Sequence, residues 1–539
     1  MAHICSYLAQ RAACSPDKTL TVCLEHKSST QVVSLEVAAL SKALREAHGI
    51  GLGDRIGLIA KGTDAFLKAF LAITACGAVA VPINLRWSVP ETEAALKSVA
   101  ASLVFVDADL LSIFLSVLSS YRCIVIGSGA HAEQPRKGDI VRQSTDWSCM
   151  QDLTREHMGA HLQLQAPADS AALICFTSGT SGPPKGVIIS HTALHCQAMA
   201  KLHAVGYRED DMYLHCAPLF HVGGLSSMIA MLAAGATQVF QPAFDAANML
   251  SLIKQHSITS FISVPAMVVS LCEAASQVSL LRAQEPRQSM RARAAYPCVR
   301  VILLGGGELP GRLKVPLRML FPGAQIVTAY GMTEACSSMT FGPLDMPSCR
   351  AASGEQPQHE SSAAAAVPAG AEPAAAQAAG GSLPGGLSRS YRRSGPGSGR
   401  GMWGVGSGAV PVGWPPPGID MCIAPAQSEG SSASSKAGEI LTRGPHVMLG
   451  YWADPEATRV ARLPGGWLRT GDLGQVDQSG CLWLLGRIKD VVRSGSESVN
   501  AAAVERMLLQ RGMRRFREWL QQLWWASHMS DWESRSALC

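Results

Sequence analysis

One stretch of sixteen residues combines the side chains that a polyphosphate site needs. It reads FTSGTSGPPKGVIISH and runs from Phe176 to His191, with small and hydroxyl-bearing residues between two apolar runs. Backbone N–H groups and hydroxyls of such a loop can surround an anion, while the single lysine, Lys185, supplies charge. Pro183 and Pro184 stiffen the stretch, which argues against a flexible linker. Lys185 follows a proline and precedes a glycine, so this is not the common P-loop. The residues favour phosphate binding over a structural loop.

A second group of candidate residues lies in the segment YGMTE, residues 330–334. Tyr330 offers a ring face to a purine, Thr333 could hydrogen-bond a phosphate, and Glu334 could hold the magnesium ion that neutralises it. The structural alternative is a core tyrosine followed by a helix N-cap and an acidic residue in the first turn. These residues alone leave both interpretations open.

Three further places carry groups that suit a nucleotide or an acid. The glycines at 305–307 follow an expected strand, where a backbone could approach a base or form a tight turn. Asp472 has two carboxylate oxygens that suit the hydroxyls of a ribose, although most Gly-Asp pairs are turns. His221 lies beside apolar residues, where a core histidine is the more common case. His191 and His195 could share a helix face, but no glutamate follows His191, which excludes the zinc-protease motif.

Alternating strand-like and helix-like segments must position these residues. Ser88 and Pro90 are typical of the cap and first turn of a helix. The pattern predicts helices at 63–76, 88–99 and 245–256, and strands at 55–60, 78–83, 103–106, 237–240, 260–264, 301–304, 325–328, 420–424 and 438–442. Strand, helix and strand at this spacing imply crossover connections and parallel sheets covered by helices. The predicted fold class is α/β, and 539 residues predict two or more domains.

The composition narrows the class of protein. The chain is 47% hydrophobic and 16% charged, which is typical of a globular protein, and its net charge of +5 argues against a nucleic-acid binder. Sixteen cysteines without a Cys-x-x-Cys pair favour a reducing, intracellular compartment. No apolar run reaches the ~18 residues of a membrane helix. Neither end carries a clear targeting signal. The small-molecule binding suggested by the loop therefore remains the leading interpretation.

Four motifs together resemble one family. TSGTSGPPKG (177–186), YGMTE (330–334), GWLRTGD (466–472) and GRIKD (486–490) are similar to the signatures and the hinge of the adenylate-forming, or AMP-binding, superfamily, in family order. That superfamily includes acyl-CoA synthetases, peptide-synthetase adenylation domains and luciferases. The resemblance implies a large N-terminal domain at 1–350 that resumes at 409–488 as a small β-rich part. A hinge and an incomplete small α+β domain would follow at 489–539.

The resemblance also implies a reaction and a set of site residues. A carboxylate would attack the α-phosphorus of ATP to give an acyl-adenylate, and the thiol of coenzyme A would then displace AMP, with Mg²⁺ as the metal held by Glu334. The implied catalytic residues are Lys185, Thr333, Glu334 and Lys489. The implied nucleotide-binding residues are Thr177, Ser178, Gly179, Thr180, Ser181, Gly182, Lys185, Gly305, Gly306, Gly307, Tyr330, Gly331, Thr333, Asp472 and Arg487. The implied acid-binding residues are His221, Ser226, Ser227 and Val264.

Longer segments of the sequence narrow the range of candidate substrates. YGMTEACSSMTF, HVGGLSS, FISVPAM and GEILTRGPHVMLGYW look like the o-succinylbenzoate–CoA ligases of plants and algae. That similarity implies an aromatic dicarboxylate as substrate, the phylloquinone pathway, and a plastid or peroxisome as compartment. The alternatives are another acyl-CoA or coumarate-type ligase and a nucleotide-binding pseudoenzyme. No basic residue in these segments is an evident partner for the second carboxylate.

Two parts of the chain depart from the family pattern. Of the fifty residues at 351–400, 35 are Ala, Gly, Ser or Pro. Because such a stretch buries little apolar surface, 351–408 is expected to be a disordered insertion. After Glu505 the resemblance ends, which indicates a truncated or aberrant C-terminal domain. No lysine follows Lys489, so the chain is expected to bind ATP and to form the adenylate slowly.

Overall fold

The structure is a computed structural model of the chain. It describes residues 3–127, 147–177, 184–282, 295–346, 409–425, 437–494 and 497–500. The expected insertion at 351–408 and the tail after Glu505 lie outside these residues. The chain divides into two compact units. The first comprises Met1–Leu344, Val412–Met421 and Thr442–Arg469, and the second comprises Asp345–Pro411, Cys422–Leu441 and Thr470–Cys539.

The first unit contains two eight-stranded sheets, one of which carries the YGMTE segment. Its strand order is β15-β14-β13-β12-β10-β11-β1-β2. The bounds in that order are Ser337–Pro343, Gln325–Met332, Val301–Leu304, Ser260–Ser263, Met212–His215, Thr237–Phe240, Thr19–Cys23 and His26–Ser29. The pairings from β14 to β1 are parallel, and the outer strands β15 and β2 are antiparallel to their neighbours.

The other sheet carries the lysine-containing stretch and has the order β19-β9-β8-β4-β3-β5-β6-β7. The bounds in that order are Gly450–Tyr451, Gly186–Ser190, Ala171–Phe176, Val79–Pro82, Arg55–Ile59, Leu103–Asp107, Cys123–Ile126 and Trp147–Cys149. The strands from β8 to β7 pair in parallel, whereas β9 is antiparallel to both β8 and β19. The predicted α/β class with parallel sheets is confirmed.

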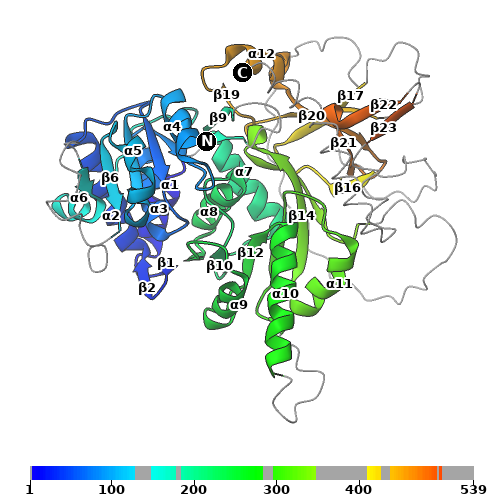
Figure 1. The fold of residues 1–539 in the computed structure, drawn as a ribbon, viewed down its shortest axis with the longest axis horizontal. Coiled ribbons are helices and arrows are strands. Elements are labelled where there is room, and N and C mark those ends of the chain that lie inside the picture. The colour runs from blue at the N-terminus through cyan, green and yellow to red at the C-terminus, as the bar shows by residue number, and fades with distance from the viewer. Residues whose placement is uncertain are drawn as a thin grey trace, which may run out of the picture. The chain divides into compact units, whose positions relative to one another are not determined.

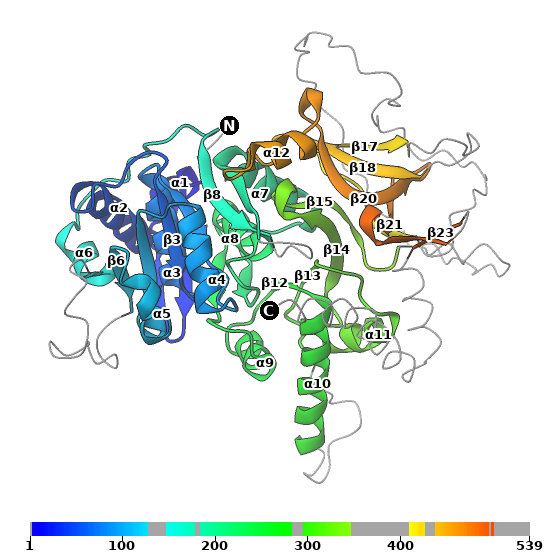
Figure 2. The same cartoon turned by 45° about the horizontal axis from the view of Figure 1, so that its top comes forward.

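Helices cover these sheets as the crossover spacing predicts (Figures 1 and 2). The N-terminal helices are α1 (Ser6–Cys14), α2 (Thr30–Glu46), α3 (Asp64–Ala75), α4 (Val89–Ser98), α5 (Leu111–Leu118) and α6 (Met150–Glu156). They are followed by α7 (His191–Val205), α8 (Val222–Ala234), α9 (Ala246–Gln255), α10 (Pro265–Arg282), α11 (Gly311–Leu320) and α12 (Pro455–Ala461). α7 and α8 lie side by side, and α7 contacts both β9 and β15. These two helices therefore link the two sheets.

Local sequence signals account for several helix starts. Ser88 and Glu91 form a capping box, with Pro90 in the first turn of α4, as the sequence predicts. The side chains of Thr63 and Asp245 accept hydrogen bonds from backbone N–H groups at the starts of α3 and α9. The parallel strands are apolar runs because helices bury both of their faces, and all five residues of β5 are buried.

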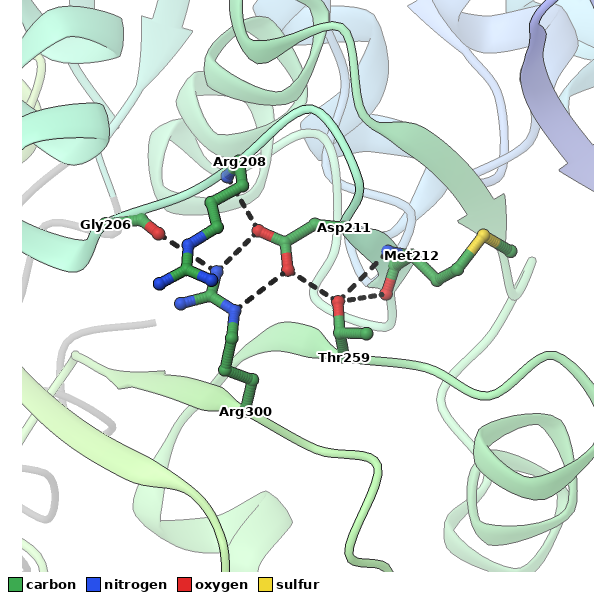
Figure 3. A network of polar contacts seen from close by, with 6 residues as sticks. All are labelled: Gly206, Arg208, Asp211, Met212, Thr259 and Arg300. Atoms are coloured by element: carbon green, nitrogen blue, oxygen red, sulfur yellow. Dashed lines mark hydrogen bonds and ion pairs between the residues drawn. The ribbon is translucent and has the colours of Figure 1, made fainter.

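An ion pair with a buried carboxylate fixes the amino ends of three neighbouring strands (Figure 3). Asp211 precedes β10 and is 2% exposed; its carboxylate lies 2.6 Å from Nη2 of Arg300, which precedes β13. It also accepts hydrogen bonds from the Thr259 hydroxyl at 2.6 Å and from the Arg208 N–H at 2.8 Å. Arg300 donates to the carbonyl of Gly206, which caps α7. Because ligands of parallel sheets bind at the carboxyl ends of the strands, we assign this network a structural role.

The second unit is built on a small antiparallel sheet. The sheet has the order β16-β21-β20-β18-β17, with bounds Val410–Gly413, Leu482–Arg487, Leu468–Val476, Gly438–Arg443 and Asp420–Pro425. The hairpin β22 (Val491–Ser494) and β23 (Glu497–Asn500) follows. The predicted small β-rich part is confirmed. Across the described residues, no helix has both the length and the apolar character that a membrane crossing requires.

Candidate functional site

The lysine-containing stretch connects β8 to β9. The backbone N–H of Thr177 donates to the carbonyl of Lys185 at 3.0 Å, and the N–H of Lys185 donates to the Thr177 hydroxyl at 3.4 Å. These bonds close the base of the loop directly above the antiparallel pair Phe176 and Gly186. Ser178, Gly179, Thr180, Ser181 and Gly182 lie outside the described residues. The hairpin thus fixes both ends of the predicted phosphate loop.

The Lys185 side chain has two partners from a segment far along the chain. Its Nζ lies 3.4 Å from Oδ2 of Asp454 and 5.0 Å from the centroid of the Tyr451 ring. β19 brings these residues close because Gly450 and Tyr451 pair with β9. The N–H of Trp452 extends this pairing by donating to the carbonyl of Gly186 at 2.7 Å.

Glu334 shares one of these partners with Lys185. Its Oε1 accepts a 2.8 Å hydrogen bond from the Tyr451 hydroxyl, and its carbonyl accepts one from the N–H of Met448 at 2.9 Å. Burial and the neighbouring charge of Glu334 raise the pKa of Tyr451, so the phenol stays protonated and can donate. Lys185 and Glu334, which the sequence assigned to phosphate and metal, therefore converge on one tyrosine ring.

A single carboxylate fits a magnesium ion that arrives with a nucleotide. Among the described residues, no group of three or more His, Cys, Asp or Glu side chains could hold a metal by itself. Mg²⁺ is usually bound by one or two carboxylates together with substrate phosphates and water. Glu334 is half-buried and meets this requirement, whereas a closed, protein-only metal site does not fit.

Thr333 and Tyr330 lie at the end of β14. Thr333 begins the short 3₁₀ helix η3 (Thr333–Ala335), whose cap residue is Met332, without a side-chain cap bond. The alternative interpretation of Thr333 as an N-cap is therefore wrong. Tyr330 is 9% exposed. A β-carbon on Gly331 would lie 1.6 Å from the carbonyl oxygen of Ser337, so only glycine allows β14 and β15 to approach here.

The three glycines follow the carboxyl end of β13. Gly305 donates its N–H to the carbonyl of Ser263 at 3.1 Å, and Gly306 adopts a φ of +74°. A β-carbon on Gly306 would lie 3.3 Å from Val264. Val264, the glycines (including Gly307) and Tyr330 thus sit at the carboxyl ends of the adjacent strands β12, β13 and β14. This is the edge at which α/β sheets bind ligands.

The residues predicted to line an acid pocket divide into two groups. His221 is exposed at the start of α8, whereas Ser226 and Ser227 are fully buried. Both serines accept hydrogen bonds from the ammonium of Lys201 on α7, at 2.6 Å and 2.9 Å. Lys201 is fully buried, and this burial lowers its pKa to about 7. None of the sequence motifs indicated Lys201; a lone lysine within the apolar run of α7 was the only signal.

The two histidines for which the zinc-protease motif was excluded lie in the core or hydrogen-bond to a core residue. His191 is fully buried and stacks on His3, with ring centroids 3.7 Å apart. His195 hydrogen-bonds Tyr7. Burial lowers the pKa of His191 to about 3 and that of His3 to about 4.

The remaining predicted residues belong to the second unit. Asp472 and Arg487 are cross-strand partners on β20 and β21, with Arg487 Nε 3.6 Å from the Asp472 carboxylate. The Asp472 side chain is 13% exposed and that of Arg487 is 63% exposed. Lys489 lies in the short 3₁₀ helix η6 (Ile488–Asp490), directly before β22.

Comparisons with known proteins identify the family of the chain. A family model described as AMP-binding enzyme matches residues 8–385. The chain is 33% identical over 521 residues to 2-succinylbenzoate–CoA ligase, chloroplastic/peroxisomal, of Arabidopsis thaliana, covering 94% of this chain and 80% of that protein. It is 28% identical over 511 residues to a feruloyl-CoA synthase of Amycolatopsis sp, covering 93% and 82%.

A solved structure shares the fold. The O-succinylbenzoate coenzyme A synthetase of Bacillus subtilis, solved in complex with ATP and magnesium ion, superimposes with a TM-score of 0.65 at 22% identity. The superposition covers 94% of this chain and 84% of that one. At this identity the likeness shows the fold alone.

Proposed function

The chain belongs to the AMP-binding enzyme family, and from that premise we propose that it is an AMP-forming acid–CoA ligase acting on o-succinylbenzoate. The convergence of Lys185 and Glu334 on Tyr451 carries the proposal, because it brings together a cation that suits a phosphate and a carboxylate that suits a metal. The identity of 33% with the Arabidopsis ligase supports the choice of acid.

Two displacements make up the proposed reaction. An oxygen of the acid's carboxylate attacks the α-phosphorus of ATP, the bond between that phosphorus and the bridging oxygen breaks, and pyrophosphate leaves. The sulfur of coenzyme A then attacks the acyl carbon, and AMP leaves while the thiol proton passes to solvent. The acid is already ionised at neutral pH, so the first step needs no general base. It needs in-line positioning and cancellation of phosphate charge.

The proposed roles combine the residue types with the family resemblance, and the positions of the residues support them. Lys185 neutralises phosphate oxygens at the mouth of the β8–β9 loop. Thr333 and Glu334, at the end of β14, contact the phosphates and the metal; bound Mg²⁺ would neutralise charge on the phosphates. Tyr330 and the glycines at 305–307 face the base. We propose that Asp472, whose two carboxylate oxygens suit two hydroxyls, takes the ribose, that Arg487 also binds the nucleotide, and that Lys489 is part of the hinge.

The acid would lie along the carboxyl ends of β10 and β12. We propose that His221 and Val264 line this site directly, and that Ser226 and Ser227 support the first turns of α8 beneath it. An aromatic dicarboxylate as the acid would also imply a step in phylloquinone formation and a plastid or peroxisome as compartment. A coumarate-type acid is the second candidate, favoured by the 28% identity to feruloyl-CoA synthase.

A competition assay tests the proposal. The protein is incubated with ATP, Mg²⁺, coenzyme A and equal amounts of o-succinylbenzoate, benzoate and 4-coumarate, and the thioesters are identified by mass spectrometry at the end point. The expected product is o-succinylbenzoyl-CoA. Coumaroyl-CoA as the main product would favour the second candidate, and ATP binding without any AMP would indicate a nucleotide-binding protein without ligase activity.

A further inference from the structure

One short segment, which contains none of the predicted site residues, contacts both charged groups of the candidate site. It begins at Met448, whose N–H binds the carbonyl of Glu334, includes β19, and ends at Asp454 before α12. β19 is fixed on one side by its pairing with β9. On the other side, the N–H of Tyr451 donates to the hydroxyl of Thr458 on α12 at 2.8 Å. The segment is therefore attached to rigid elements, which makes it suited to position other side chains.

Asp454 has two separable roles. One carboxylate oxygen accepts the N–H of Ala457 at 2.8 Å and so caps α12, while the other faces Lys185 at 3.4 Å. The hydrogen bond from Ala457, and then Lys185, lower the pKa of Asp454, so the carboxylate is charged at neutral pH. Asparagine caps helices about as well as aspartate. Asp454→Asn therefore removes the charge facing Lys185 while it keeps the cap.

Tyr451 contacts both charged groups at once. Its hydroxyl donates to Glu334, and the face of its ring lies under the Lys185 ammonium. A phenylalanine would keep the ring and the cation–π contact but would leave the Glu334 carboxylate without this donor. The hydrogen bond and the ion pair can thus be removed one at a time.

We propose that Tyr451 and Asp454 are positioning residues of the nucleotide site. Asp454 forms an ion pair with Lys185 until a polyphosphate displaces it. Tyr451 orients the Glu334 carboxylate toward the metal. This inference rests on the proposed function only in placing ATP at Lys185 and Glu334. The Asp454 carboxylate then competes with the nucleotide for one ammonium. Because both partners are about half-exposed, the competition is modest.

The inference predicts opposite effects for the two variants. Asp454→Asn should bind MgATP about two- to fivefold more tightly, the range that an exposed ion pair allows. Tyr451→Phe should raise the Mg²⁺ concentration that gives half-maximal ATP binding by about tenfold or more, since a hydrogen bond to a charged group is lost. A merely structural role would lower the melting temperature without moving the Mg²⁺ dependence.

Titration calorimetry with ATP, at fixed and varied Mg²⁺ and without any acid, measures both effects. Asp245→Asn is the matched control, because Asp245 is another exposed aspartate that caps a helix, α9. Tyr121→Phe controls for the loss of a tyrosine hydroxyl away from the site. Both controls should bind MgATP as the unmodified protein does.

Double variants separate this inference from the proposed function. In a Lys185→Met background, Asp454→Asn should no longer tighten binding, and in a Glu334→Gln background, Tyr451→Phe should no longer change the Mg²⁺ dependence. If Lys185→Met leaves ATP affinity unchanged, the proposed nucleotide site is wrong and this inference with it. If Lys185→Met weakens binding but Asp454→Asn fails to strengthen it, only this inference is overturned.

Discussion

Replacing the buried lysine of α7 should change how stability depends on pH. Lys201 is fully buried, and its ammonium donates hydrogen bonds to the hydroxyls of Ser226 and Ser227 and to the carbonyl of Gly223. No carboxylate among the described residues lies within ion-pair distance of it. Burial lowers its pKa to about 7, against an ordinary value of about 10.4. Lys201→Met keeps the length of the side chain and removes the titrating group.

The direction of the pH dependence follows from how many protons the folded and the unfolded chain bind at Lys201. Between about pH 7 and 10 the unfolded chain binds a proton at Lys201 that the folded chain has released, so stability rises with pH in this window. At about 1.4 kcal/mol per pKa unit, the full difference is about 5 kcal/mol. Integrating from pH 7 to pH 9 gives about 2 kcal/mol. The unmodified protein should therefore gain about 2 kcal/mol relative to Lys201→Met over that interval.

Urea unfolding followed by tryptophan fluorescence, at pH 7, 8 and 9 and constant ionic strength, measures this difference. Subtracting the two proteins removes the contribution of other titrating groups. Lys201→Met should be at least as stable as the unmodified protein at pH 7, because an apolar residue of similar size often replaces a buried charge without loss. Parallel stability curves for the two proteins would refute the reasoning, since they would mean that Lys201 keeps its ordinary pKa when folded.

Three further predictions follow from the contacts. Glu334→Gln should lower Mg²⁺-dependent pyrophosphate release about a hundredfold with little change in melting temperature; an unchanged rate would remove Glu334 from the site. Asp211→Ala should cost about 3 kcal/mol of unfolding free energy, because it leaves Arg300 unpaired, whereas Asp420→Ala, at an exposed pair, should cost about 1 kcal/mol or less. Equal losses would contradict the structural role of Asp211. Burial lowers the pKa of His191 to about 3, so the unfolded chain binds more protons than the folded chain below about pH 6.5. His191 should therefore lower the free energy of unfolding as the pH falls. His191→Leu should therefore lose about 2 kcal/mol less than the unmodified protein between pH 7 and 5 in the same urea assay, and an identical loss would show that His191 titrates normally.

Local patterns predicted much of the fold and part of the site. The capping box at Ser88 and the buried run of β5 depend on neighbouring residues, so the sequence shows them directly. Lys185 and Glu334 could be proposed from the sequence because their residue types suit phosphate and metal. That they meet at Tyr451 could not be predicted, because Tyr451 and Glu334 are 117 positions apart and β19 has only two residues. The burial of Lys201 depends in the same way on the packing of α7 against α8.

The measurement that bears most directly on the proposed function is the identity of the thioester formed from competing acids. With ATP, Mg²⁺ and coenzyme A present, the protein should convert o-succinylbenzoate to its coenzyme A thioester with one AMP per product, and Lys185→Met should form far less of it. A different main thioester would contradict the assigned acid. ATP binding with no AMP from any acid would contradict the assignment as a ligase.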